Sequence, residues 1–121
     1  MSKKILVVED TEDNRQILRD LLEMAGYNMI EARDGAEGVA RAAEHRPDLI
    51  LMDIQMPVMD GYEATRRIKA DPDLKSIPVI AVTSYALSGD EDKARAAGCD
   101  GYIAKPFSPR RMLAKVREIL D

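Results

Sequence analysis

Three short runs of this sequence are apolar at every position, and no other feature constrains the fold as strongly. A strand without a polar face is buried on both sides, which is typical of a parallel sheet with helices packed against each face. The three runs are Ile5-Leu6-Val7-Val8, Leu49-Ile50-Leu51-Met52 and Val79-Ile80-Ala81-Val82. Two weaker strands are predicted over residues 28–32 and 101–104. The sequence therefore predicts a five-stranded parallel sheet.

Segments with a helical spacing of apolar residues lie between these strands, and their starts carry helix N-cap signals. Thr11 precedes two acidic residues that suit the first turn of a helix, and Gly26 suits its end. The apolar stripe of that helix is predicted to be Ile17, Leu18, Leu21, Leu22 and Ala25. The other predicted N-caps are Asp34, Asp60 and Ser88, each with Glu three residues later, and Ser108, which precedes Pro109. Five strands alternating with five helices predict a doubly wound α/β fold.

Length and composition indicate one globular domain over residues 1–121. Of these residues 45% are hydrophobic and 33% are charged, the net charge is −4, and the aromatic residues are four Tyr and one Phe. A nucleic-acid binder more often carries a basic patch and aromatic stacking platforms, so DNA and RNA are not expected ligands. The apolar run at residues 5–8 is too short for a signal peptide or a membrane span. We therefore expect a cytoplasmic protein without a membrane partner.

Charged and polar residues follow four of the predicted strands. Glu9-Asp10 follows the first run, Asp53 the second, Thr83-Ser84 the third, and Lys105-Pro106 the strand at 101–104. In open α/β sheets, ligands bind outside the carboxyl ends of the strands. Each residue alone could be an ordinary turn, cap or loop residue. Because all of them fall at the same edge of one sheet, they predict a functional site.

The charges predicted at this edge require compensation. Two unit charges about 4 Å apart repel by roughly 4 kcal/mol at an effective dielectric constant of ~20. Glu9, Asp10 and Asp53 would therefore destabilise the fold unless cations lie beside them, and Lys105 supplies one positive charge. Oxygen ligands without His or Cys favour a hard cation such as Mg²⁺. Cys99 is the only cysteine, which excludes an intrachain disulfide and a Cys-rich metal site.

At these residues the sequence resembles the receiver domains of the response regulators of bacterial two-component systems. The resemblance covers the chain from Lys4 to Leu120. The segments that carry it are Ile5-Leu6-Val7-Val8-Glu9-Asp10, Pro47 to Pro57 with Met59-Asp60-Gly61, Val82-Thr83, and Lys105-Pro106-Phe107. The resemblance implies a flavodoxin-like sheet of order 2-1-3-4-5, with the site where the chain order reverses between the first and third strands.

The resemblance also implies a phosphoacceptor and a metal site. Asp53 is the expected nucleophile that accepts a phosphoryl group, which makes the chain a phosphoprotein. Asp10 and Asp53 are expected to ligate Mg²⁺, with Mn²⁺ as an expected substitute. Glu9 is expected to hold a metal-bound water, and the carbonyl of Gln55 to complete the coordination by the protein.

The same resemblance assigns roles to four more residues and a second role to Gln55. Lys105 is expected to bind a phosphoryl oxygen, with a cis bond to its following proline, and Thr83 to hydrogen-bond another phosphoryl oxygen. Tyr102 occupies the position of the switching aromatic residue, and the less favoured alternative is a half-buried strand residue. Gln55 and Tyr85 are expected to flank the attacking water and to tune dephosphorylation.

The expected partners are proteins. The phosphodonor is a sensor histidine kinase or a histidine phosphotransfer protein, docking near the helix that begins after Thr11 and the loop after the strand at 101–104. The chain ends after its last predicted helix, so we expect no output domain and a downstream effector that binds the surface formed by residues 89–97, 101–104 and 109–120. Residues 86–100 resemble single-domain receivers of the DivK type and also receivers fused to hybrid kinases. We therefore expect a protein that catalyses its own phosphorylation and slow dephosphorylation and is not a turnover enzyme.

Four alternatives compete with this interpretation. An aspartyl-phosphate enzyme of the haloacid-dehalogenase kind needs a second Asp two residues after the first, where this chain has Gln55. A cobalamin module needs an Asp-x-His-x-x-Gly loop, but the only histidine, His45, precedes Arg46-Pro47. A flavin module would have more aromatic residues for stacking. A receiver-like scaffold that binds partners without phosphorylation is the most serious alternative, although such proteins usually lose an acid, the Thr or the Lys.

Overall fold

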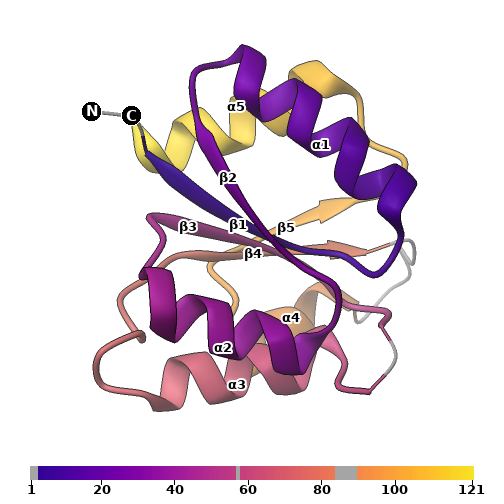
Figure 1. The fold of residues 1–121 in the computed structure, drawn as a ribbon. Coiled ribbons are helices and arrows are strands. Elements are labelled where there is room, and N and C mark those ends of the chain that lie inside the picture. The colour runs from indigo at the N-terminus through magenta and orange to yellow at the C-terminus, as the bar shows by residue number, and fades with distance from the viewer. Residues whose placement is uncertain (1–2, 57, 84–89) are drawn as a thin grey trace.

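The computed structural model describes residues 3–56, 58–83 and 90–121, and its strands alternate with its helices along the chain (Figure 1). The strands are β1 (Lys4–Val8), β2 (Asn28–Ala32), β3 (Leu49–Asp53), β4 (Val79–Thr83) and β5 (Gly101–Ala104). The helices are α1 (Glu12–Met24), α2 (Gly35–His45), α3 (Gly61–Ala70), α4 (Asp90–Ala97) and α5 (Pro109–Leu120). The two weaker strands have the predicted bounds, and Asp53 and Thr83 each end a strand.

All neighbouring strands in the sheet are parallel, in the order β2-β1-β3-β4-β5. The order reverses between β1 and β3, which are paired in the sheet although α1, β2 and α2 lie between them in the chain. In their register Val8 lies beside Met52, so Glu9, which follows β1, and Asp53, the last residue of β3, lie side by side at the carboxyl edge of the sheet. The predicted fold and strand order are therefore confirmed.

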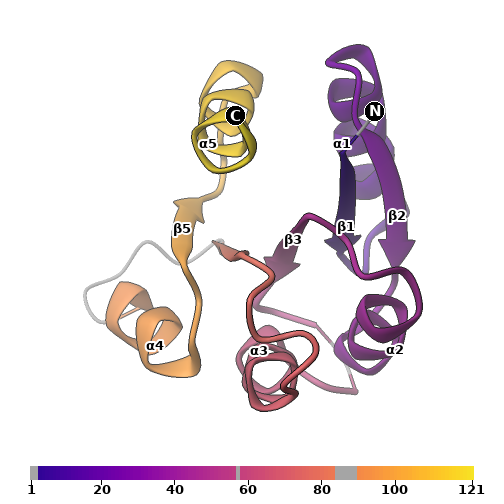
Figure 2. The same cartoon turned by 90° about the vertical axis from the view of Figure 1, so that its left-hand side faces the viewer.

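Helices cover both faces of the sheet, and each face has its own apolar core. Figures 1 and 2 show α1 and α5 on one face and α2, α3 and α4 on the other. The first core contains Ile5, Val7, Leu51, Ile80 and Val82 from the sheet with Leu18, Leu22, Met112 and Val116 from the helices. The second contains Leu6, Val8, Ile50, Met52 and Val79 with Ala42, Ala64 and Ile68. Alternate residues of one strand thus enter opposite cores, which explains why the runs are apolar at every position.

Three of the predicted N-caps make the expected side-chain hydrogen bond. The side chains of Asp34, Asp60 and Ser108 each accept from the main-chain N–H three residues later. Thr11 precedes α1 but its side chain makes no cap hydrogen bond. The predicted cap at Ser88 lies outside the described residues.

One apolar residue of α1 was placed wrongly by the sequence pattern. Ile17 is 57% exposed, whereas its neighbour Leu18 is buried against the sheet. Successive helical residues are about 100° apart, so the position before a core residue can fall at the rim of the buried face. In the parts of the chain that are described, none of the helices is long and apolar enough to cross a membrane.

Candidate functional site

Two adjacent strands bring three carboxylates together at the carboxyl edge of the sheet. Glu9, directly after β1, is 3% exposed, and Asp53, the last residue of β3, is 4% exposed. Asp10 is exposed to solvent. One carboxylate oxygen from each residue lies within 4.8 Å of the other two. The structure therefore contains the predicted acidic cluster, with two of its three members almost completely buried.

One ammonium group contacts both buried carboxylates. Lys105 Nζ donates to Glu9 Oε2 at 3.1 Å and lies 3.5 Å from Asp53 Oδ2. The main-chain N–H of Lys105 donates to the Thr83 carbonyl at 2.6 Å, which ties the loop after β5 to the end of β4. The bond between Lys105 and Pro106 is cis, as expected. The residue predicted to compensate the acidic cluster therefore does contact it.

The pKa values of the two buried carboxyl groups are shifted in opposite directions. The pKa of Asp53 is raised to about 7, because burial and then the adjacent Glu9 raise it by more than Lys105 and the Gln55 N–H lower it. The pKa of Glu9 lies below its ordinary value, because hydrogen bonds with Asp53 and Asn14 and the charge of Lys105 outweigh the effect of burial. Glu9 is thus the better-stabilised anion, and Asp53 is the group that a further cation would stabilise most.

Glu9 is held at both carboxylate oxygens. Its Oε1 accepts from the Thr11 N–H at 3.3 Å and from Asn14 Nδ2 at 3.1 Å, and its Oε2 accepts from Lys105. Asn14 was not predicted from the sequence to belong to the site. The available signal was its place in the first turn of the helix that begins just after the acidic pair, which directs its side chain back toward the strand end.

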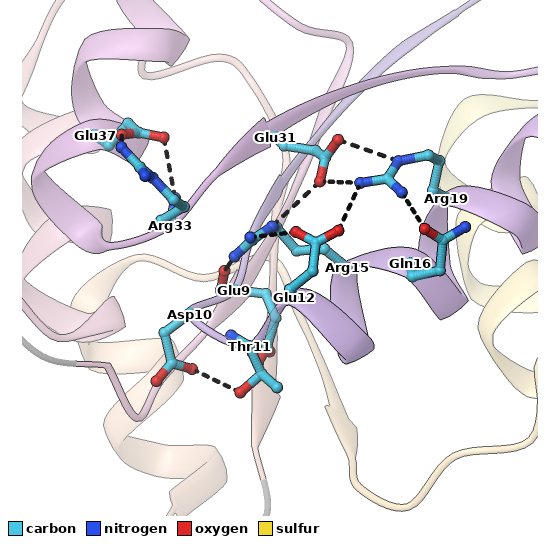
Figure 3. Close-up of polar contacts among 10 residues, drawn as sticks. All are labelled: Glu9, Asp10, Thr11, Glu12, Arg15, Gln16, Arg19, Glu31, Arg33 and Glu37. Atoms are coloured by element: carbon cyan, nitrogen blue, oxygen red, sulfur yellow. Dashed lines mark hydrogen bonds and ion pairs between the residues drawn. The ribbon is translucent and has the colours of Figure 1, made fainter.

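A second residue that the sequence analysis missed lies behind the acidic pair. Arg15 is 7% exposed, and its Nη1 donates to the main-chain carbonyl of Glu9 at 2.8 Å (Figure 3). Its other nitrogens pair with carboxylates of α1 and β2. Sequence reasoning assigns a lone Arg on a helix to the solvated face, so nothing in the pattern indicated that this one is buried.

The other predicted residues of the site lie close to Asp53 or in its neighbouring strand. The N–H of Gln55 donates to Asp53 Oδ1 at 3.3 Å, and its side chain is exposed. Thr83 ends β4 and is 1% exposed. Ile54 donates to the Val82 carbonyl, so β3 and β4 stay paired up to the site. Tyr85 lies outside the described residues, and its predicted role stays a prediction.

Tyr102 lies on β5, half-buried, and packs against a small cluster of Ile54, Ala81 and Ala94. In the β4–β5 register Tyr102 lies beside Ala81, and Thr83 lies beside Ala104. Since side chains alternate along a strand, Thr83 and Tyr102 project from the same face of the sheet. This shared face is the one that α4 covers, through Ala94.

A cleft of about 470 Å³ opens beside the acidic cluster, between α1 and the loop after β5. Its polar end is formed by Glu9, Asn14, Asp53 and Lys105, and its walls are mostly apolar. The walls include the exposed Ile17 of α1 and Phe107 of the loop. An apolar surface directly beside buried carboxylates suits contact with a protein.

The donor set of the acidic cluster fits a hard divalent cation. All three candidate ligands are carboxylates, and the cluster contains neither a thiol nor an imidazole. One lysine faces two buried carboxylates, and the pKa of Asp53 is raised by burial and by the neighbouring Glu9 despite that lysine. Magnesium takes one or two carboxylates together with waters and phosphate oxygens, which matches this arrangement of one exposed and two buried acids.

Comparison with known proteins agrees with the geometry. The family model of the response regulator receiver domain matches residues 5–117. The polar-differentiation response regulator DivK of Brucella anthropi is 48% identical over 120 residues, covering 99% of this chain and 98% of the relative. DivK of Brucella melitensis has the same identity and coverage.

Solved structures with this fold include two that are informative for the site. The chemotaxis protein CheY4 of Vibrio cholerae superposes with a TM-score of 0.93 at 31% identity, covering 98% of this chain and 99% of that one. The receiver domain of a sensor histidine kinase from Pseudomonas aeruginosa PAO1 gives a TM-score of 0.92 at 37% identity, covering 99% and 98%. That domain has a magnesium ion coordinated in its active site cleft.

Proposed function

The chain belongs to the response regulator receiver domain family, and from this premise we propose that Asp53 accepts a phosphoryl group from a protein phosphohistidine. The observation that carries the proposal is the buried Asp53 carboxylate, which lies with Glu9, Asp10 and Lys105 at the edge of a cleft. The donor is a sensor histidine kinase or a histidine phosphotransfer protein. The phosphorylated chain then signals by binding an effector or passes the phosphoryl group on.

The transfer requires an ionised Asp53 in line with the phosphorus–nitrogen bond of the donor. An oxygen of Asp53 forms a bond to phosphorus while the phosphorus–nitrogen bond breaks, and the electron pair of that bond stays on the imidazole nitrogen. Lys105 already lies 3.5 Å from Asp53 Oδ2 and would bind a phosphoryl oxygen. Thr83, at the end of β4, would donate its hydroxyl to another.

We further propose that Asp10, Asp53 and the Gln55 carbonyl hold Mg²⁺, with Glu9 binding one of its waters. When bound, Mg²⁺ neutralises negative charge on the carboxylates and on the transferring phosphoryl oxygens. Glu9 suits a water-binding role because Asn14, Thr11 and Lys105 already occupy its oxygens.

Gln55 and Tyr85 would tune the lifetime of the aspartyl phosphate. The chain would undergo its own phosphorylation and dephosphorylation without acting as a turnover enzyme.

Two surfaces are proposed for the two kinds of protein partner. The phosphodonor would dock over α1 and the loop after β5, where Ile17 and Phe107 flank the cleft. The effector would bind the α4–β5–α5 surface. Phosphorylation would draw Thr83 toward the phosphoryl group and allow Tyr102 to rotate inward, which shifts a pre-existing equilibrium between two conformations. The shared face of Thr83 and Tyr102 supports this coupling.

Intact mass spectrometry after a brief incubation with acetyl phosphate tests the proposal. The expected result is a phosphoryl adduct that forms with Mg²⁺, not with EDTA, and not in the Asp53→Asn variant. If no adduct forms, titration with beryllofluoride separates rapid hydrolysis from a lack of acceptor chemistry. Failure of both would leave a scaffold that binds partners without phosphorylation as the better account.

A further inference from the structure

Arg15 is a buried cation that takes no part in the proposed phosphoryl transfer. Its side chain is 9% exposed, although a guanidinium is rarely buried unless every donor finds a partner. Nη1 donates to the Glu9 carbonyl at 2.8 Å, Nε donates to Glu31 Oε1 at 3.2 Å, and Nη2 pairs with Glu12 (Figure 3). Arg15 thus links the first turn of α1, the edge strand β2 and the main chain at the site.

The Glu9 carbonyl lies just beyond the paired part of β1. The last paired residue of β1 is Val8, which lies beside Ala32 of β2 and Met52 of β3. Beyond this point the N–H of Glu9 still donates to the Ala32 carbonyl at 3.0 Å. The carbonyl of Glu9 accepts from Arg15 instead of from a strand. A buried carbonyl needs such a donor, and a charged donor forms the stronger hydrogen bond.

This hydrogen bond bears directly on Asp10, because the Glu9 carbonyl belongs to the peptide that joins the two acids. The orientation of that peptide sets where the Asp10 side chain leaves the main chain. Asp10 is exposed, and the Thr11 hydroxyl approaches its Oδ1 only at 3.5 Å, the limit of a hydrogen bond. Glu9, in contrast, is held through both carboxylate oxygens. The placement of Asp10 therefore depends on the main chain more than on contacts of its own carboxylate.

We propose that Arg15 is a positioning residue for the cation site, holding the Glu9–Asp10 peptide so that the Asp10 carboxylate faces Asp53. This inference rests on the proposed function, because the proposed cation is the ligand whose binding it affects. Glu31 and Glu12 serve as counterions that keep the Arg15 guanidinium in place. A residue that orients a metal ligand without binding the metal often contributes about tenfold or more to metal affinity.

The sign of the effect distinguishes positioning from simple electrostatics. A positive charge near a cation site weakens cation binding, so removal of Arg15 should strengthen Mg²⁺ binding if its charge alone mattered. If Arg15 positions Asp10, its removal should weaken Mg²⁺ binding despite the lost repulsion. Arg19 is the matched control, because it pairs with the same Glu31 and Glu12. Among the described residues its partners also include Gln16 but not Glu9.

The test is calorimetric titration of the purified full chain with MgCl₂, at a temperature where every variant is folded. For Arg15→Met the expected result is a dissociation constant raised on the order of tenfold, against less than about twofold for Arg19→Met. Arg15→Lys, which keeps one donor, should fall between Arg15→Met and the wild type. Magnesium binding by Arg15→Met that is unchanged or tighter, even with a lowered melting temperature, would overturn the proposal and leave a structural role.

A second variant keeps the proposal testable if Arg15→Met does not fold. Glu31→Gln leaves the guanidinium in place but removes one of its charged partners, and it should weaken Mg²⁺ binding by a smaller factor than the loss of Arg15. Unchanged binding in Glu31→Gln together with Arg15→Lys would contradict the positioning role. Failure of the proposed function has a different signature, since the wild-type chain itself would then give no Mg²⁺ binding heat.

Discussion

Lys105 and Glu9, 96 residues apart in the chain, are joined by a hydrogen bond of 3.1 Å at the carboxyl edge of the sheet. The same ammonium lies farther from Asp53, at 3.5 Å. Lys105 therefore lies closer to Glu9, the proposed water-binding acid, than to Asp53, the proposed phosphoryl acceptor. Under the proposed function, this position would keep Lys105 within reach of an incoming phosphoryl group as well as of Glu9.

Replacement of Lys105 by Met should destabilise the metal-free protein, because Glu9 and Asp53 would remain buried without their common cation. The expected loss is about 1–3 kcal/mol in the free energy of unfolding at pH 8, measured by urea denaturation in EDTA. Lys93→Met, on the exposed surface of α4, is the control and should change stability by less than about 0.5 kcal/mol. Equal effects of the two variants would argue against the compensation by Lys105.

Asp53→Asn should stabilise the metal-free protein at pH 8 and have little effect at pH 4. The folded-state pKa of Asp53 is raised from 3.8 to about 7, so ionisation of this group destabilises the fold as the pH rises through that interval. The shift sets an upper limit of about 4 kcal/mol, and the neutral amide removes this penalty. Urea denaturation in EDTA at both pH values measures the gain, which should exceed about 1 kcal/mol at pH 8. A gain of the same size at both pH values would contradict the assignment.

Val58 should be a site where substitution stabilises the fold. This β-branched residue is 85% exposed and has a φ of 69°, in the left-handed region that β-branched side chains rarely adopt. Val58→Asn should raise the free energy of unfolding by about 1 kcal/mol, because Asn tolerates this conformation. Val58→Ala should give a smaller gain, which separates relief of backbone strain from removal of exposed apolar surface. A loss of stability in both variants would show that the conformation is not strained.

Gly61 should not tolerate a side chain. A Cβ atom at this first residue of α3 would overlap the main-chain oxygen of Asp53 and approach Ile54 Cα at 2.9 Å. We expect Gly61→Ala to cost about 2 kcal/mol or more and to weaken Mg²⁺ binding by displacing Asp53. Gly26→Ala is the control, since nothing lies within 4 Å of its Cβ position and only its φ of +91° penalises the change. It should leave Mg²⁺ binding unchanged, as calorimetry can determine.

Tyr102→Ala should abolish phosphorylation-dependent effector binding without affecting phosphorylation itself. Tyr102 packs against Ile54, Ala81 and Ala94, on the side of the sheet that Thr83 shares, and it makes no part of the acidic cluster. The variant should form the aspartyl phosphate at the wild-type rate but lose phosphorylation-dependent binding of an effector. Mass spectrometry checks the first expectation and binding of the beryllofluoride-treated chain checks the second. Wild-type effector binding would exclude Tyr102 as the switch.

The sequence determined the elements of this fold and the chemistry at their ends. Runs that are apolar at every position are buried on both faces, so the sequence predicted a parallel sheet covered by helices. It also predicted that Glu9, Asp10, Asp53 and Lys105 lie together at the carboxyl edge of that sheet. The N-caps at Asp34, Asp60 and Ser108 could also be predicted from the sequence, because a cap depends on residues three positions apart. These features follow from local spacing and from the geometry common to parallel sheets.

The tertiary structure decided which side chains meet and which are buried. Arg15 and Ile17 are neighbours on α1, yet the cation is buried under the site and the apolar residue is exposed beside the cleft. No local sequence pattern predicts this difference, because the burial of Arg15 depends on its hydrogen bonds to Glu31 of β2 and to the main-chain carbonyl of Glu9. A buried charge is stable only where partners from separate elements converge, and that convergence exists only once the chain is folded.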